Sequence, residues 1–200
     1  MKIIGLTGGI ACGKSTVSKA LRALGACIID ADALAHELSQ PNQALFNAYV
    51  QRFGMAIVTP GGTLDRAAIA RLIFTDPTMR AEVEQISHPL IRRAVEERLR
   101  MAEKEQKRAA VLDVPLLFEA GWALADEVWV VALPPEEQLT RLLARDKTMS
   151  EGEARARIAA QMPLAEKCAR ADVVIDNSGT KEETRDYVGK LWEERIFGRA

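Results

Sequence analysis

Residues 8–15 read GGIACGKS, and this stretch fits the pattern G-x-x-x-x-G-K-[ST] at every fixed position. Residues 2–6, directly before it, form a short apolar run that predicts a strand. Residues 14–24, directly after it, place apolar side chains at helical spacing. A glycine-rich turn between a strand and a helix is the setting in which this pattern binds phosphate. The stretch therefore predicts an α/β protein with an anion site at the start of its first helix.

The chemistry of this phosphate loop follows from its residue types. Gly8 and Gly13 let the backbone turn so that several N–H groups point into one concavity, which holds a phosphate. Lys14 is expected to reach the β- and γ-phosphates, and the Ser15 hydroxyl to bind Mg²⁺. Thr16 is placed for a contact with an α-phosphate. The nucleotide-binding residues predicted in the loop are Gly8, Gly9, Ala11, Cys12, Gly13, Lys14, Ser15 and Thr16.

The alternative interpretation of the loop is a structural glycine-rich turn with a chance lysine. The flanking strand and helix make this alternative weaker, because the motif stands in its expected context.

Four further apolar runs predict the other strands of a sheet. They cover residues 27–29, 109–114, 127–133 and 173–175. Helical patterns separate them, as in a parallel α/β sheet. The predicted fold class is therefore a P-loop NTPase three-layer α/β fold with a five-stranded parallel sheet.

Almost every residue between 32 and 107 has a helical pattern, punctuated by prolines. We expect Asp65 to cap one helix there and Pro89 to begin another that runs to Lys107. The predicted domains are a core of residues 1–31 and 108–200, with a lid at about 141–170, and a helical insertion of residues 32–107. The helices expected after the insertion are 136–145, 150–161 and 181–197.

Composition sets limits on the class of protein. The chain has 200 residues, 48% of them hydrophobic, and a net charge of −1, which argues against disorder and against a general attraction to nucleic acid or membranes. The apolar run at the start of the chain is too short for a signal peptide. The three cysteines, Cys12, Cys27 and Cys168, fit neither a disulfide framework nor a metal motif, so we expect reduced thiols and a cytoplasmic protein.

Three aspartates follow predicted strands. Asp30 and Asp32 follow the second strand, at the sheet edge where ligands bind, so either could accept a proton from an attacking hydroxyl group. Alternatively, either could cap the helix before Ala33. Asp113 ends the third strand, where P-loop proteins place a carboxylate that organises a metal, although it could also be a simple turn residue.

A basic stretch covers residues 141–170, with seven basic and four acidic residues. A basic lid would neutralise the charge of a transferred phosphoryl group and exclude water. For most of these residues a salt-bridged solvent face is the better interpretation. Arg141 and Arg145 are the two that we expect to act on phosphate.

The assembled motifs resemble the dephospho-coenzyme A kinase family over nearly the whole chain. They are IGLTGGIACGKS (residues 4–15), IDAD (29–32), GTLDR (62–66), IF (73–74), HPLIR (88–92), LDVPLLFE (112–119), RD (145–146), RI-x-x-Q (157–161) and AD-x-VIDN-x-G (171–179). The order of IDAD, HPLIR and DVPLLFE is specific, whereas the phosphate loop alone names only a superfamily.

The resemblance implies an adenylate-kinase-like core that phosphorylates the ribose 3′-hydroxyl of dephospho-CoA with ATP and Mg²⁺. ATP and dephospho-CoA would be the only partners, and we expect a monomer or a weak homo-oligomer. It implies Asp32 as the base, with Lys14 and Arg145 as the other catalytic residues, and Asn177 near the adenine. The substrate-binding residues implied are Asp32, His88, Arg92, Pro115, Leu116, Leu117 and Glu119; the metal ligands expected are Ser15 and Asp113.

The chain departs from the family in one place. Members often carry Gly-Ser where this sequence has Ala11-Cys12. A thiol beside a helix N-terminus is expected to have a lowered pKa, so oxidation of Cys12 would block ATP binding. His88, placed by its neighbour Pro89 at a helix start, could instead be a capping or core histidine.

Three rival functions remain at this stage. Another small-molecule or nucleotide kinase would differ in the inserted region. A GTPase-like switch is disfavoured because the sequence has neither N-K-x-D nor D-x-x-G after a strand. A non-catalytic nucleotide-binding module is disfavoured by the presence of Asp32 together with Lys14.

Overall fold

The computed structural model describes residues 1–198, except for the side chains of residues 73–75 and 77. The IF motif at residues 73–74 therefore lies outside the described side chains. The chain divides into two compact units. Unit 1 contains Met1–Ile29 and Ala102–Ala200, and unit 2 contains Asp30–Met101.

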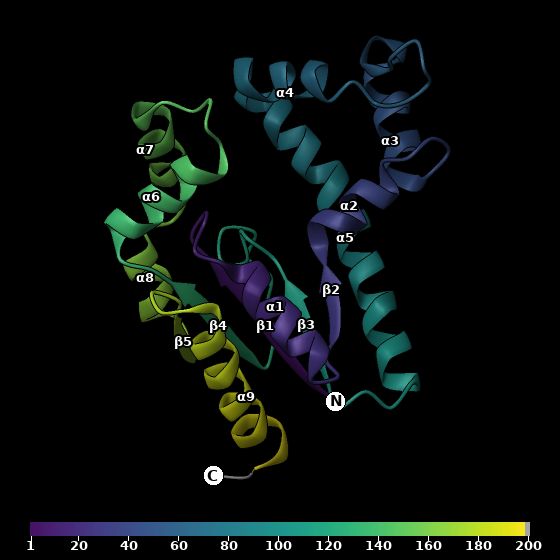
Figure 1. The fold of residues 1–200 in the computed structure, drawn as a ribbon. Coiled ribbons are helices and arrows are strands. Elements are labelled where there is room, and N and C mark those ends of the chain that lie inside the picture. The colour runs from purple at the N-terminus through teal and green to yellow at the C-terminus, as the bar shows by residue number, and fades with distance from the viewer. Residues whose placement is uncertain (199–200) are drawn as a thin grey trace. The chain divides into compact units, whose positions relative to one another are not determined.

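Unit 1 is built on a five-stranded sheet in the order β2-β3-β1-β4-β5 (Figure 1). β1 pairs in parallel with β3 and β4, and β4 pairs in parallel with β5. The strands are β1 (Lys2–Gly8), β2 (Cys27–Asp30), β3 (Ala109–Asp113), β4 (Glu127–Ala132) and β5 (Val173–Asp176). β1 and β3 contain long runs of buried residues because strands inside a parallel sheet are covered on both faces. The predicted fold class is confirmed.

The described part of unit 1 also contains five complete helices. They are α1 (Lys14–Ala23), α6 (Pro135–Arg145), α7 (Glu151–Ala159), α8 (Leu164–Ala169) and α9 (Lys181–Phe197). α1 and α9 lie side by side in Figure 1 and share one apolar core with the sheet, which includes Val17, Trp129 and Trp192. α6 and α7 form a second, smaller cluster around Leu142 and Ala154. The sheet core and the pair of α6 and α7 therefore have separate apolar clusters.

Local capping explains several helix boundaries. Thr180 and Glu183 form a reciprocal capping box at the start of α9, and Ser150 with Glu153 does the same for α7. The end of α1 is followed by Gly25, whose φ of 99° suits a residue without a side chain. The sequence did not predict α8. This helix has six residues, too few for a periodic pattern, and it follows Pro163, which is already a break in the sequence.

Unit 2 is helical. It contains α2 (Ala31–Leu38), α3 (Ala44–Phe53), the short 3₁₀ helix η1 (Met55–Ile57), α4 (Arg66–Thr75) and most of α5 (Pro77–Lys104). Leu45, Tyr49, Ile57 and Val83 are the buried centre of its apolar core. Asp65 caps α4 by accepting a hydrogen bond from the Ala68 N–H at 2.9 Å, as predicted.

The prediction that Pro89 begins a helix was wrong. α5 starts at Pro77 and continues through Pro89. A proline inside a helix removes one backbone hydrogen bond, but it does not forbid the helix when packing holds both sides. Here Val83, which precedes Pro89 by less than two turns, lies in the core of unit 2. His88 is consequently an exposed residue in the middle of a helix, neither a cap nor a core residue.

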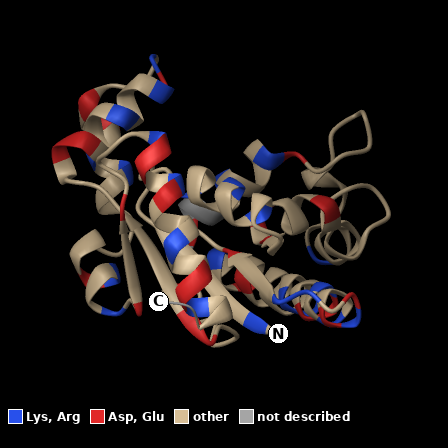
Figure 2. Ribbon diagram, turned by 60° about the horizontal axis from the view of Figure 1, so that its bottom comes forward, with Lys and Arg blue, Asp and Glu red and all other residues tan. Residues whose placement is uncertain are grey.

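Charged residues of both signs are interspersed along the helices, whereas the strands are mostly uncharged (Figure 2). Within the described residues, no helix combines the length and the apolar character that crossing a membrane requires.

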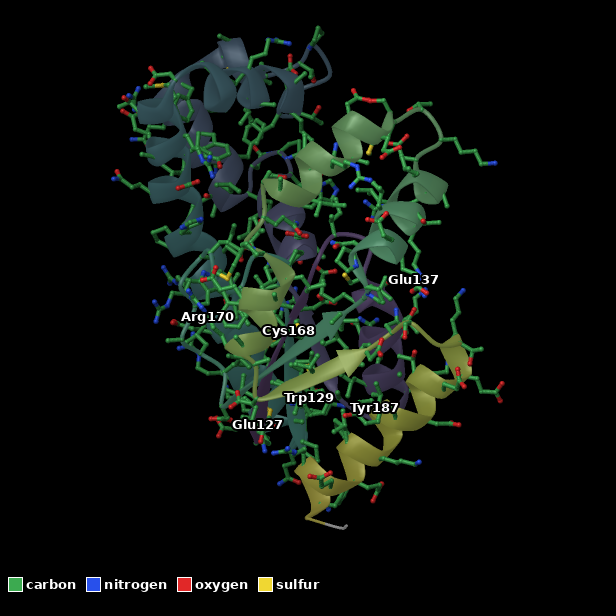
Figure 3. All side chains as sticks on the ribbon, turned by 90° about the vertical axis from the view of Figure 1, so that its left-hand side faces the viewer. Glu127, Trp129, Glu137, Cys168, Arg170 and Tyr187 are labelled. Atoms are coloured by element: carbon green, nitrogen blue, oxygen red, sulfur yellow. The ribbon has the colours of Figure 1, made fainter. Side chains whose placement is uncertain are left out.

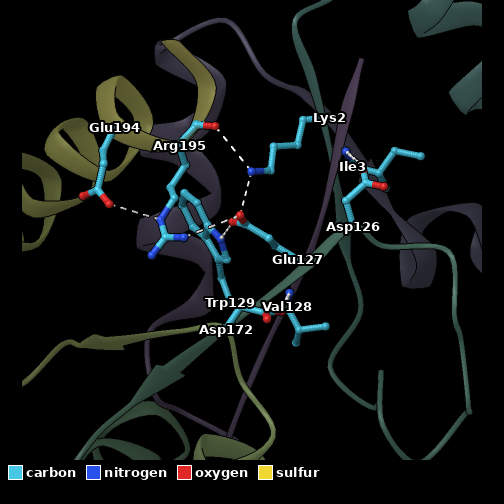
Figure 4. A network of polar contacts seen from close by, with 9 residues as sticks. All are labelled: Lys2, Ile3, Asp126, Glu127, Val128, Trp129, Asp172, Glu194 and Arg195. Carbon is cyan, nitrogen blue, oxygen red and sulfur yellow. Dashed lines mark hydrogen bonds and ion pairs between the residues drawn. The ribbon is translucent and has the colours of Figure 1, made fainter. Parts of the chain in front are cut away.

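The N-terminal ends of the strands are joined by a charged network centred on Glu127 (Figure 4). The Glu127 carboxylate accepts hydrogen bonds from Lys2 Nζ at 2.6 Å and from Trp129 Nε1 at 3.1 Å, and Arg195 Nη1 lies 3.6 Å away. Burial alone would raise the pKa of Glu127, but these three partners outweigh it and hold the pKa below its ordinary 4.5. Figure 3 shows Glu127 and Trp129 at one end of the sheet, far from Glu137 in α6.

We expect Glu127→Gln to lower the free energy of unfolding by about 2 kcal/mol at pH 7, because it weakens charge-assisted hydrogen bonds in a half-buried site. The pKa of Glu127 is lower in the folded protein, so its stabilisation is complete above pH 4.5 and is lost as the pH falls through the lowered pKa. Urea denaturation at several pH values measures this.

Glu194→Gln is the matched control for that experiment. Glu194 is 55% exposed and contacts Arg195 in the same network, so its loss should change stability by well under about 1 kcal/mol. A Glu127→Gln deficit that stays constant as the pH falls would contradict the assignment.

Candidate active site at the phosphate loop

The phosphate loop connects β1, in the middle of the sheet, to α1. Its glycines are required by close contacts. A Cβ on Gly8 would lie 2.5 Å from the Val131 carbonyl oxygen of β4. Gly13 has a φ of 88°, and a Cβ there would lie 2.0 Å from Asn177 Nδ2. The loop therefore lies so close to its neighbours that side chains at these two positions would collide with them.

Several carbonyl oxygens of the loop accept hydrogen bonds from groups of the protein itself. The Gly9 oxygen accepts from the Cys12 N–H at 3.1 Å, and the Gly13 oxygen accepts from the Thr16 N–H at 2.8 Å. Asn177 Nδ2 donates to the Cys12 oxygen at 2.8 Å. These three carbonyl oxygens are therefore hydrogen-bonded within the protein. The positive end of α1, with the N–H groups of its first turn, is the part of the loop suited to an anion.

A cavity of about 350 Å³ opens over this loop. Arg141 and Arg145 from α6 and Pro115 from the segment after β3 also line it. The structure thus brings the two arginines singled out in the sequence to the phosphate loop. Arg141 also lies 3.4 Å from Glu137, one turn earlier on α6. The remaining lining residues are residues 8–15 and Gln161.

Lys14 donates a hydrogen bond to the Asp113 carboxylate. Asp113 is buried at the end of β3, with 7% of its side chain exposed, while Lys14 keeps 21% of its side chain exposed at the cavity. Burying a carboxylate is costly unless a positive charge or hydrogen bonds compensate it. This ion pair therefore places both a cation and an oxygen donor beside the phosphate loop, and Ser15 is exposed there.

A fully buried lysine, Lys167, holds the segment after β3. The sequence had indicated a solvent-facing position for this residue. Lys167 of α8 has no exposed side-chain surface. Its ammonium group contacts Glu119 at 2.9 Å and the Pro115 carbonyl oxygen at 3.2 Å. The Thr7 hydroxyl donates to the same Pro115 oxygen at 2.9 Å. Pro115 and Glu119 are thereby fixed relative to the sheet.

The side chains of this segment point in different directions. Leu117 is 1% exposed and packs beside Gly5 of β1, so it belongs to the core. Leu116 is 45% exposed. Burial alone would raise the pKa of Glu119, but the Lys167 hydrogen bond, the N–H of Met162 and the lysine charge hold that pKa below its ordinary value.

Asn177 holds the phosphate loop through a side-chain hydrogen bond. Its side chain is buried, and both ends of the amide are engaged, because Nδ2 donates to Cys12 and Oδ1 accepts from the Thr184 hydroxyl at 2.7 Å. This arrangement gives the Asn177 side chain a structural role in the loop. A contact between Asn177 and a nucleotide base stays a prediction.

The expectation for Cys12 was wrong. Cys12 is completely buried, and burial raises the pKa of its thiol to about 11, although hydrogen bonds with the backbone of Gly9 and Leu133 act in the opposite direction. The helix N-terminus does not lower the pKa because the thiol points into the apolar core, with Val17 and Ile175 among its members. A buried thiol with a raised pKa is a poor target for oxidation.

The other candidate residues lie in unit 2. Asp32 is exposed in the first turn of α2, while Asp30 caps that helix by accepting from the Ala33 N–H at 3.0 Å. Asp32, His36 and Arg66 line a cavity of about 280 Å³ within this unit. Arg66 donates to the His36 ring, a contact that sequence reasoning did not foresee. Arg66 did carry a signal, because it closes the GTLDR motif.

The last two candidates are on α5. His88 and Arg92 are both exposed, and Arg92 pairs with Glu96 at 3.1 Å. Their predicted part in substrate binding is not tested by these contacts.

Comparisons with known proteins decide the family. The sequence model of the dephospho-CoA kinase family matches residues 2–183. The chain belongs to the dephospho-CoA kinase family. A dephospho-CoA kinase from Symbiobacterium thermophilum is 50% identical to this chain, over 99% of this chain and 83% of that protein. A dephospho-CoA kinase from Geobacter metallireducens is 48% identical, over 98% of each chain.

Solved structures agree with this dephospho-CoA kinase assignment. The dephospho-CoA kinase from Campylobacter jejuni is similar at a TM-score of 0.74 and 31% identity over 99% of both chains. A crystal structure from Thermus thermophilus is similar at a TM-score of 0.82 and 38% identity, over 96% of this chain and 97% of that one. The family resemblance read from the motifs is confirmed.

We expect Cys12 to stay unlabelled when the native kinase is treated with iodoacetamide at pH 8, because its thiol is buried and protonated. Mass spectrometry of the digested protein measures the labelling of each cysteine. The same treatment in denaturant is the control and should label all three cysteines. Rapid labelling of Cys12 in the native protein would contradict its burial.

The pair of Glu119 and Lys167 gives a second prediction. Glu119→Gln leaves a buried ammonium group without its carboxylate and should cost about 3 kcal/mol of unfolding free energy. Lys167→Met replaces the buried cation with an apolar side chain of similar length, while Glu119 keeps 26% of its side chain exposed, so it should cost less. Denaturant unfolding compares the two. A larger loss from Lys167→Met would refute this account of the pair.

Proposed function

We propose that this chain transfers the γ-phosphoryl group of ATP to the ribose 3′-hydroxyl of dephospho-CoA, giving coenzyme A and ADP, the last step of coenzyme A synthesis. The observation that carries the proposal is the phosphate-loop cavity, which Lys14, Arg141 and Arg145 line in a dephospho-CoA kinase scaffold, with Asp113 bonded to Lys14. The phosphate loop accounts for the donor, and membership of the family accounts for the acceptor.

The phosphates of ATP would lie at the N-terminus of α1, with Lys14 on the β- and γ-phosphates. Lys14 is suited to this role because it is a flexible point charge with part of its side chain exposed to the cavity. Arg145, which lines the same cavity, would stabilise negative charge on the phosphoryl group during transfer. Arg141 stands beside it as a second cation.

The residues beside the loop also suit Mg²⁺. The Ser15 hydroxyl and the Asp113 carboxylate are oxygen donors, the type that Mg²⁺ prefers, and each is next to the predicted phosphate position. When bound, Mg²⁺ would neutralise phosphate charge. Lys14 would then exchange its contact with Asp113 for contacts with phosphate.

Asp32 is the proposed general base. Its carboxylate would accept the proton of the 3′-hydroxyl group while that oxygen bonds to the γ-phosphorus and ADP leaves. Its exposure supports this role, and so does the cavity that it lines with His36 and Arg66. His88, Arg92, Pro115, Leu116 and Glu119 are proposed to contact the coenzyme. For Leu117 the backbone is the only available contact, because its side chain is buried. The cytoplasmic location and the oligomeric state stay predictions.

The decisive assay mixes the protein with ATP, Mg²⁺ and dephospho-CoA and follows ADP release, with AMP and adenosine as control acceptors. We expect release that depends on dephospho-CoA. Release with AMP or adenosine instead would point to another P-loop kinase. Tight ATP binding without turnover of any acceptor would leave only a nucleotide-binding module.

Asp32→Asn should lower kcat by about 10²- to 10⁴-fold while ATP still binds, since a general base contributes on that scale. Asp30→Asn is the matched control, two residues away. Asp30 caps α2, and asparagine caps helices equally well, so its turnover should stay near that of the unchanged protein. Near-normal turnover of Asp32→Asn would show that another residue is the base.

A further inference from the structure

Two glutamines hydrogen-bond to the backbone of one phosphate-loop residue, Ile10, one at its N–H and one at its carbonyl oxygen. The Ile10 N–H donates to Gln161 Oε1 at 2.9 Å, and Gln138 Nε2 donates to the Ile10 carbonyl oxygen at 2.9 Å. We call these two residues the glutamine clamp. The two side chains come from positions 23 residues apart in the chain, so the clamp exists only in the folded protein.

The clamp lies where the loop most needs support. Ala11, the residue after Ile10, has a φ of 61°, a left-handed conformation that is unfavourable for a residue other than glycine. Such a conformation persists when its surroundings hold it. The hydrogen bonds at the Ile10 N–H and at the Ile10 carbonyl oxygen hold the two peptide groups that precede the Ala11 Cα. The position of the Gln138 side chain also explains why residue 9 is a glycine, because a Cβ there would lie 2.5 Å from Gln138 Nε2.

The clamp joins the phosphate loop to the lid helices. Gln138 is 4% exposed on α6, and Gln161 follows the end of α7 and lines the phosphate cavity. Ile10 and Ala11 also pack against the apolar cluster of these helices, which is centred on Leu142 and Ala154. The loop is thus held by the lid through both polar and apolar contacts.

The next residue after Gln161 makes a further connection. The Met162 N–H donates to Glu119 at 3.1 Å, and Glu119 is the partner of the buried Lys167. Residues 161 and 162 therefore contact both the phosphate loop and the segment after β3.

We propose that Gln138 and Gln161 are positioning residues that hold the phosphate loop in its anion-binding shape and fix it to the lid. Neither side chain is assigned a contact with the reacting atoms. The inference rests on the nucleotide-binding part of the proposed function and does not depend on the identity of the acceptor. A loop that loses its tie to Gln161 has to be ordered by the nucleotide itself, which weakens nucleotide binding.

Gln161→Met tests this inference, because methionine keeps the length of the side chain and removes the acceptor oxygen. Calorimetry with ATP and Mg²⁺ should show an affinity roughly five- to tenfold weaker than that of the unchanged protein, the scale of one hydrogen bond. The midpoint of thermal unfolding without nucleotide should change little, since Gln161 is only partly buried.

Gln161→Glu is the rescue variant, because a carboxylate still accepts from the Ile10 N–H. Its added charge repels the phosphates at low salt, but at about 1 M salt the Debye length is only about 3 Å. At that salt its affinity should return to within about twofold of the unchanged protein, and Gln161→Met should stay weak. Arg155→Met is the matched control on α7; its side chain is 56% exposed and pairs with Glu151, and it should bind ATP normally.

Normal ATP affinity of Gln161→Met would overturn the inference and leave the proposed function intact. Equal weakness of both Gln161 variants at high salt would also overturn it, since the acceptor oxygen would then be irrelevant. Failure of the unchanged protein to bind ATP would overturn the inference and the proposed function together. Binding of ATP without phosphorylation of dephospho-CoA would contradict only the proposed acceptor.

Discussion

The shape of the phosphate loop is the constraint on which the rest of the site depends. A loop that binds phosphate has to direct N–H groups at an anion and keep its own carbonyl oxygens engaged elsewhere. In this protein Asn177, Gln138 and the loop itself supply the donors for those oxygens. Gly8 and Gly13 permit the close approach, because a side chain at either position would collide with Val131 or Asn177. The loop is thus hydrogen-bonded to Gln138 of α6, to Gln161 and to Asn177, and a preorganised site of this kind costs little to reorganise when charge develops.

Charges that the fold buries are paired, and the pairs have different consequences. Lys2 and Glu127 pair at the N-terminal ends of β1 and β4, at the other end of β1 from the phosphate loop, and are expected to contribute to stability. Lys167 and Glu119 fix the segment after β3. Lys14 and Asp113 differ from Lys167 and Glu119 because Lys14 remains partly exposed to the cavity. A partly solvated lysine can leave its carboxylate for a phosphate at moderate cost, whereas the fully buried Lys167 cannot. The degree of burial thereby separates Lys14 from Lys167, whereas Lys2, which is 28% exposed, differs from Lys14 in lying at the other end of β1 from the phosphate loop.

Much of the fold was readable from local patterns. The five strands have strong apolar runs, and the last helix was predicted at its observed bounds, where the structure shows a capping box of Thr180 and Glu183. The failures have identifiable causes. Pro89 suggested a helix start, but packing around Val83 carries α5 through it. α8 is too short to show a period. Cys12 stands beside a helix N-terminus, yet its thiol points into the core, and only the direction of a side chain could reveal that its pKa is raised.

By itself, the sequence determined the class of chemistry, because a phosphate loop is a contiguous stretch whose glycines, lysine and serine act through their own backbone and side chains. It also determined the family, through motifs whose order needs no coordinates. Tertiary structure alone decided how the site is supported. Gln138, Gln161 and Asn177 reach the loop from separate elements, and Lys167 lies among surface-like basic residues in the sequence although it is fully buried. The physical reason is that backbone conformation at a glycine-rich loop is a local property, whereas burial and the partner of a hydrogen bond depend on which distant segments the fold brings together.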